Sequence, residues 1–286
     1  MGLNRLLAAT DFSSRAERAL ERAHQLSEQF SAQLHILHVV DDDQPAALVE
    51  QEARQAADLL DSIVASFPEG GQVQPTPIVR KGDPFAEIAT TAADLDADLL
   101  VMGPHRKQML RDVFVGTTVE RVMRTGQRPV LMVNGEPSGP YKRVLVAIDL
   151  SDASAKALRT ARGLGLLSGA SVTLLHAFEP LAKGMMIYAN IERERIEEHV
   201  ASEAAEARQA ISAFLDGLKM SDVPYTVRLE EGSPYDTIRK TVERSKPDLL
   251  VIGTRGLTGL KRILLGSVAD ALLRGVECDI MAVPPG

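Results

Sequence analysis

The chain has 286 residues, 45% of them hydrophobic and 25% charged, which is typical of a folded protein of about two domains. Its net charge is −7 and it carries no basic block, so we expect no nucleic-acid partner. No apolar run reaches the roughly 18 residues that span a bilayer, no signal-peptide pattern opens the chain, and the single Cys278 excludes a disulfide framework. We therefore expect a cytoplasmic protein without a membrane span.

The N-terminal half begins with a short apolar run at 6–10, as expected for a strand that is buried on both faces of a parallel sheet. A helix follows, with Ala and Leu at helical spacing, and Ser14 with Glu17 is interpreted as the capping box at its start. The next expected elements are a strand at 34–40, a long helix at about 45–66 and a third strand at 76–80.

Gly82, Asp83 and Pro84 then announce another helix, because Asp caps free N–H groups and Pro is tolerated at the first helical position. A strand at 98–103, a loop, a short helix and a fifth strand at 129–133 complete the half. Alternating strands and helices predict an α/β fold with a doubly wound, parallel five-stranded sheet and helices on both faces. We expect the strand order 3-2-1-4-5, with a ligand site beyond strands 1 and 4, where the winding reverses.

The C-terminal half repeats this pattern. A shift of 138 places 5–39 on 143–177 without a gap, with 12 of 35 positions identical, and a shift of 150 places 96–103 on 246–253. The difference between the shifts is an insertion between Phe178 and Pro224. The Gly- and Pro-rich stretch 134–142 is interpreted as a linker, so we predict two domains, 1–137 and 138–286.

One motif of the second half carries chemistry. Gly253 is followed by Gly256 and then, after nine intervening residues, by Gly266 and Ser267. Gly256 lets the backbone approach a ligand, and the helix that opens at Gly266 offers unpaired N–H groups and a dipole to an anion. Backbone N–H groups in such a loop cradle phosphates without a lysine. Asp149 ends the first strand across the same crevice, where a carboxylate can bond a ribose hydroxyl.

The segments VLVAIDLS, DLLVIGTRG and GLKRILLGSVADALL resemble the universal stress protein family, and the resemblance covers the chain twice, as in the tandem-domain subgroup. It implies a stress-response protein that binds ATP, with or without Mg²⁺, and has no defined metabolic reaction. It places Asp149 at the ribose or adenine, the backbone near Ala177 at the adenine, and the glycines with Ser267 at the phosphates. The full nucleotide-binding set is Ala147, Asp149, Ala177, Gly253, Arg255, Gly256, Gly266 and Ser267.

The first half departs from this motif. Arg106 stands in place of the second glycine, where its side chain would enter the phosphate space, and Pro104 lacks a backbone donor. We therefore predict weak or absent ATP binding there, with Arg106 meeting an anion directly as the alternative. The degenerate site comprises Asp11, Val39, Gly103, Arg106, Gly116 and Thr117.

Other conspicuous residues receive structural interpretations. We expect His35, His38 and His176 to be packed near strand ends with their rings satisfied, and no zinc spacing is present. Cys278 is interpreted as a small buried residue, and the acidic run 41–43 as a solvated loop.

The inserted segment 183–200 leaves two interpretations open. Its apolar residues 185–188 form either a lid or partner surface, or a helix start that packs on its own sheet. The fifth strands are edge strands, which pair with another strand unless covered, so we expect an intrachain pseudo-dimer or a homodimer.

Three functions compete. The first is a nucleotide-binding regulatory or signalling protein of the stress response. The second is a slow ATPase or autophosphorylating enzyme that uses Arg255, Lys261, Arg262 and the hydroxyls of Thr254, Thr258 and Ser267, although no evident base or P-loop lysine is present. The third is a nucleotide-independent dimeric scaffold.

Overall fold

The computed structural model describes residues 2–68, 71–104, 118–220, 222–256 and 265–285. The first half consists of β1 (Arg5–Ala9), α1 (Ser14–Phe30), β2 (Gln33–Val40), α2 (Ala46–Ser66), β3 (Thr76–Lys81), α3 (Pro84–Asp94), β4 (Leu99–Met102), α4 (Thr118–Thr125) and β5 (Val130–Met132). The second half consists of β6 (Arg143–Ala147), α5 (Asp152–Gly163), β7 (Ser171–Phe178), α6 (Leu181–Tyr188), α7 (Arg193–Leu218), β8 (Tyr225–Glu231), α8 (Pro234–Ser245), β9 (Leu249–Gly253), α9 (Ser267–Gly275) and β10 (Asp279–Val283).

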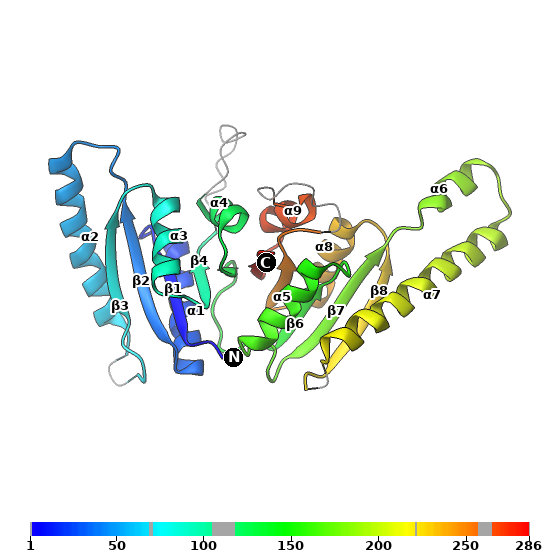
Figure 1. Ribbon diagram of the computed structural model, residues 1–286, viewed down its shortest axis with the longest axis horizontal. Coiled ribbons are helices and arrows are strands. Elements are labelled where there is room, and N and C mark those ends of the chain that lie inside the picture. The colour runs from blue at the N-terminus through cyan, green and yellow to red at the C-terminus, as the bar shows by residue number, and fades with distance from the viewer. Residues whose placement is uncertain (1, 69–70, 105–117, 221, 257–264, 286) are drawn as a thin grey trace.

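The ten strands form one sheet in the order β3-β2-β1-β4-β5-β10-β9-β6-β7-β8. Each half therefore has the predicted order 3-2-1-4-5, and its own strands run parallel. The two halves meet where β5 and β10 pair antiparallel, with Met281 opposite Leu131. The expected edge-to-edge pairing thus occurs within the chain and makes the two five-stranded sheets continuous. Figure 1 shows the two halves side by side, with β3 and β8 at opposite ends of the molecule.

Helices cover both faces of the sheet because successive strand residues point to opposite sides. On β1, Leu6 and Ala8 belong to one buried cluster and Leu7 to the other. The first cluster includes side chains of α1, α2, α5 and α7, and the second includes side chains of α3, α4, α8 and α9. The continuous apolar runs of the strands follow from this burial on both faces.

The start of α1 differs by one residue from the expected capping box. Ser13, not Ser14, is the N-cap, and its hydroxyl accepts from the Ala16 N–H at 3.4 Å. The Asp11 carboxylate in turn accepts from the backbone N–H and hydroxyl of Ser13, and Phe12 takes a φ of 58°. The tight turn fixed by Asp11 therefore sets the first residue of the helix.

The predicted linker packs between the halves around one buried carboxylate. The Asp279 carboxylate accepts from the N–H groups of Asn134 and Gly135 at 3.0 and 2.9 Å and from the Tyr141 hydroxyl at 2.7 Å. It also lies 3.2 Å from Nε of Arg22, whose guanidinium stacks on the Tyr141 ring. Burial raises the pKa of Asp279, and these donors oppose the rise. The contacts tie α1, the linker and β10 together.

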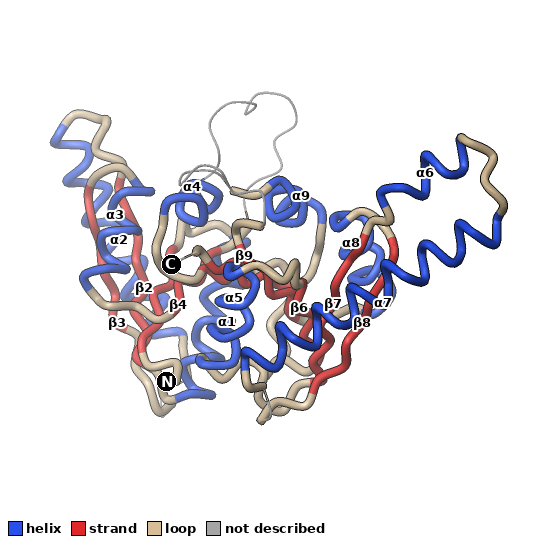
Figure 2. Tube along the Cα trace, turned by 45° about the vertical axis from the view of Figure 1, so that its right-hand side comes forward, coloured by secondary structure: helices blue, strands red, loops and turns tan. Residues whose placement is uncertain are grey.

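The inserted segment forms α6 and the start of α7, which extend beyond the edge of the sheet (Figure 2). The α6 side chains Met185 and Tyr188 are 71% and 94% exposed. The interpretation of this segment as a helix start that packs on its own sheet is therefore wrong. No helix of the described residues has both the length and the apolarity that crossing a bilayer requires.

Candidate functional site

A cavity of about 270 Å³ opens at the carboxyl ends of β6 and β9, where the winding of the second half reverses. All eight residues of the predicted set line it: Ala147, Asp149, Ala177, Gly253, Arg255, Gly256, Gly266 and Ser267. The structure adds apolar walls that the motif does not contain, from β7, α8 and α9: Leu175, Pro234, Ile238, Val268 and Leu272. Pro234 follows Gly232 and Ser233 at the start of α8, the counterpart of Gly82, Asp83 and Pro84 in the first half, so this helix start also borders the cavity.

Asp149 and Gly256 lie next to each other in the lining of this cavity. Oδ1 of Asp149 accepts from the backbone N–H and the hydroxyl of Ser151, which is the N-cap of α5. Oδ2 lies on the side of Gly256, because a Cβ built at Gly256 would stand 2.7 Å from it. A larger residue at position 256 would therefore require the carboxylate or the loop to shift.

The N-terminus of α9 is free of a side-chain cap among the described residues. Gly266 is its N-cap, and the Gly266 N–H donates to the Thr254 carbonyl at 2.8 Å. By contrast, α5 and α8 in the same half are capped by the hydroxyls of Ser151 and Ser233. Uncapped N–H groups and the positive end of a helix dipole attract an anion. The end of α9 thus presents such groups to the cavity beside Ser267.

Two predicted features have a structural role. A Cβ at Gly253 would lie 3.1 Å from the Ala153 carbonyl group, so this glycine allows the end of β9 to approach α5. The Thr254 N–H donates to the Val283 carbonyl at 2.9 Å. The donor that Pro104 lacks at the equivalent place is therefore one that bonds a strand in the second half, rather than one left for a phosphate.

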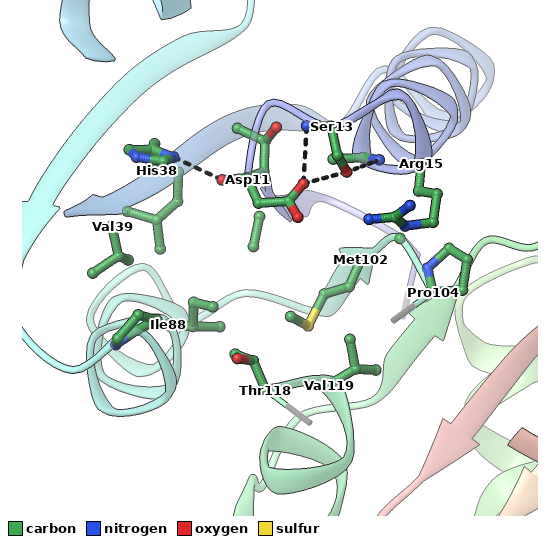
Figure 3. Close-up of a pocket in the computed structure, with 16 residues that line it drawn as sticks. Asp11, Ser13, Arg15, His38, Val39, Ile88, Met102, Pro104, Thr118 and Val119 are labelled. Atoms are coloured by element: carbon green, nitrogen blue, oxygen red, sulfur yellow. Dashed lines mark hydrogen bonds between the residues drawn. The ribbon is translucent and has the colours of Figure 1, made fainter. Parts of the chain in front are cut away.

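The first half has an equivalent cavity of about 440 Å³ (Figure 3). Three residues of the predicted degenerate site line it: Asp11, Val39 and Gly103. The other three, Arg106, Gly116 and Thr117, lie outside the described residues. The lining also includes residues absent from the predicted set, among them Arg15, His38, Pro84, Ile88 and Thr118. For Arg15, the alignment of the two halves could have drawn attention to the residue, because this arginine aligns with Ala153 in the second half.

The histidines at the strand ends have satisfied rings, as expected. Nδ1 of His38 lies 2.9 Å from the Thr10 carbonyl, and Nδ1 of His176 lies 2.8 Å from the Ile148 carbonyl. A carbonyl only accepts, so Nδ1 carries the proton in both residues. The packing interpretation is confirmed for these two. His35 differs: its Nδ1 is buried without a hydrogen-bond partner among the described residues, and burial lowers its pKa.

Cys278 and the acidic run also behave as ordinary structural residues. Burial raises the pKa of the Cys278 thiol to about 12, so the thiol stays protonated at neutral pH. The acidic residues at 41–43 are exposed, and the Asp41 carboxylate accepts from the Asp43 N–H. Within the described ranges, no group of three or more His, Cys, Asp or Glu side chains is placed to hold a metal ion.

Comparison with known proteins assigns the family. The model of the Universal stress protein family matches residues 2–134 and 140–284. A universal stress protein of Methanocaldococcus jannaschii is 31% identical over 152 residues, 52% of this chain and 85% of the relative, and one from Synechocystis is 27% identical over 150 residues, 50% and 97% of the two chains. The crystal structure of a universal stress protein from Archaeoglobus fulgidus shares the fold over all of both chains, with a TM-score of 0.73 at 19% identity. The chain therefore belongs to the universal stress protein family and carries two of its domains in tandem.

Proposed function

We propose that this protein binds ATP in the cavity of its second domain and acts as a regulatory or signalling protein of the stress response in the cytoplasm. The observation that carries the proposal is the uncapped N-terminus of α9, which borders the same cavity as Asp149 and the glycines of the motif. The domain limits that we propose are 1–137 and 138–286, with the boundary in the packed linker.

The proposed site divides into three chemical regions. Apolar side chains of β7 and α8, Leu175 and Ile238, offer a slot for the adenine ring beside the Ala177 backbone. Oδ2 of Asp149 is available to a ribose hydroxyl because the Ser151 bonds fall on Oδ1. The phosphates would lie against the N–H groups and the hydroxyl at Ser267.

A magnesium ion would arrive with the nucleotide, because Mg²⁺ is usually held by phosphates and one or two carboxylates. Asp149 is the acidic side chain among the described lining residues. The proposed cofactor is therefore ATP itself, with Mg²⁺ as its companion.

Hydrolysis and a pure scaffold are less well supported. Thr254 is buried with its N–H bonded to Val283, and Thr258, Lys261 and Arg262 lie outside the described residues. Among the described lining residues, Asp149 is the carboxylate that could act as a general base, and the proposal assigns it to the ribose. A homodimer would need a surface other than the β5 and β10 edges, because these already pair with each other.

The test compares two glycine substitutions in the full chain by isothermal titration with ATP and Mg²⁺. Gly256→Ala places a methyl group 2.7 Å from Oδ2 of Asp149, so the carboxylate or the loop must move. At about 1–3 kcal/mol for such overpacking, ATP affinity should fall about ten- to a hundredfold. Gly217→Ala is the matched control, because a Cβ there meets nothing within 4 Å.

The outcomes separate the candidate functions. Unchanged ATP affinity in Gly256→Ala would remove this cavity as the ATP site. No ATP binding by the unmodified protein would favour the scaffold. Phosphate release in the same samples that disappears in Gly256→Ala would establish hydrolysis.

A further inference from the structure

Arg15 is a cation at the edge of the first cavity, without an ion-pair partner in the part of the chain that the structure describes. It lies in the first turn of α1, is partly buried and lines the cavity. Two other arginines of the same helix have carboxylate partners: Arg18 lies 3.1 Å from Glu136, and Arg22 lies 3.2 Å from Asp279. Arg15 makes no ion pair or hydrogen bond with its side chain among the described residues. Among the described residues, no carboxylate is paired with its positive charge.

The position of Arg15 is unfavourable for the helix itself. A cation near a helix N-terminus opposes the dipole, whereas an anion there is favoured. The second domain has Ala153 at the equivalent position and avoids this cost. The Arg15 backbone lies close to the residue that follows β4, because a Cβ at Gly103 would lie 2.8 Å from the Arg15 carbonyl oxygen. Figure 3 shows the guanidinium on the side of the cavity between Asp11 and Pro104.

The remainder of the first cavity matches the second in its apolar slot and carboxylate. Leu37 and Ile88 line it where Leu175 and Ile238 line the other cavity. Oδ1 of Asp11 accepts from the Ser13 N–H and hydroxyl, which leaves Oδ2 for another donor. The cavity lining therefore offers an apolar slot for a ring, a carboxylate for a hydroxyl and the Arg15 guanidinium for an anionic group.

We propose that the first cavity binds a nucleoside monophosphate and that the Arg15 guanidinium binds its phosphate. A guanidinium presents a planar fork of donors that fits one phosphate group. The glycine spacing of the second domain is not repeated here, because Arg106 stands where that domain has Gly256. The tandem chain thus carries two sites of different phosphate preference. The assignment of the first cavity does not require that the second one binds ATP.

The experiment uses the full chain with Gly256→Ala as background and measures AMP and adenosine binding by equilibrium dialysis. We expect Arg15→Ala to weaken AMP binding about ten- to a hundredfold, as for a lost hydrogen bond to a charged group, and to leave adenosine binding unchanged. Arg15→Lys, which keeps the charge but loses the fork, should give an intermediate affinity for AMP. Arg159→Ala, which removes an exposed arginine of α5, is the control and should change neither affinity.

Dependence on Arg15 assigns the bound AMP to the first cavity, whatever the second cavity does. Asp11→Asn should weaken AMP and adenosine together, since both carry the ribose. Absence of AMP binding, an AMP affinity that ignores Arg15, or an equal loss of AMP and adenosine in Arg15→Ala would each overturn the proposal. Circular dichroism before dialysis verifies that each variant is folded.

Discussion

At the scale of single residues, Arg15 predicts a conflict between stability and binding. Replacing it with Ala removes a cation from the first turn of α1 and introduces the best helix former. Without ligand, the free energy of unfolding of Arg15→Ala should therefore rise by about 0.3–1 kcal/mol, measured by urea denaturation. A loss of stability would mean that Arg15 has a structural role, which the described contacts do not include. The same variant loses AMP affinity if the guanidinium binds the phosphate of the ligand.

Asp248 gives a pH-dependent prediction at the same scale. Burial raises the pKa of its carboxyl, but the N–H groups of Lys142 and Arg143 and the Arg143 guanidinium outweigh this and hold the pKa below its ordinary value of 3.8. A lowered pKa in the folded state stabilises the protein above the unfolded pKa, and the stabilisation disappears as pH falls through the folded pKa. Asp248→Asn should cost about 1 kcal/mol near pH 7.

The difference between wild type and Asp248→Asn should shrink below about pH 4, where the unfolded carboxyl takes up a proton, and vanish at still lower pH. Urea denaturation at a series of pH values measures it. Asp58→Asn is the control, because the exposed Asp58 side chain has no hydrogen bond among the described residues. A cost that stays constant down to pH 2 would contradict the assignment of the effect to ionisation.

At the scale of elements, hydrophobic periodicity correctly predicts those elements whose position is determined by burial alone. The strands are found where apolar runs predict them because both faces of the sheet are covered. The predicted start of α1 is wrong by one residue because the Asp11 carboxylate, which accepts from the Ser13 N–H, organises the turn before the helix. That bond is local, but apolar periodicity does not report side-chain bonds. The role of Arg15 is missed for a different reason: it depends on the chain at Gly103, which is distant in sequence, and a local pattern contains no tertiary placement.

The position of α6 argues against the hypothesis that this segment forms a lid over a cavity. Met185, Ile187 and Tyr188 are exposed, and no described residue of α6 lines either cavity. Replacing all three with Ser should therefore leave ATP affinity unchanged, with a stability change of about 0.5 kcal/mol or less, measured by titration and urea denaturation. Ile238→Ala, which opens the wall of the second cavity, should lower ATP affinity in the same assay. Loss of ATP affinity in the triple variant would support the hypothesis that α6 acts as a lid.

At the scale of the whole molecule, the halves share one sheet and one buried polar cluster. The β5–β10 pairing continues the sheet, and Asp279 connects the linker to Arg22 of α1. Sequence indicates the edge pairing because each half ends in an apolar strand. It does not indicate the cluster, since Arg22 and Asp279 are 257 positions apart and each resembles a surface residue in its own segment. Their burial arises only when the halves meet.

This shared interface predicts that the halves unfold together. Asp279→Ala leaves the Arg22 guanidinium buried without its carboxylate, which costs about 3–5 kcal/mol. Because the loss falls at the contact between halves, urea denaturation followed by circular dichroism should change from one transition to two. Tyr141→Phe is the control: it removes one hydrogen bond to Asp279, costs about 1 kcal/mol and keeps a single transition. Two transitions in the wild-type protein would mean that the pairing of β5 with β10 is too weak to couple the unfolding of the two domains. Ligand binding to one domain would then have no effect on the other.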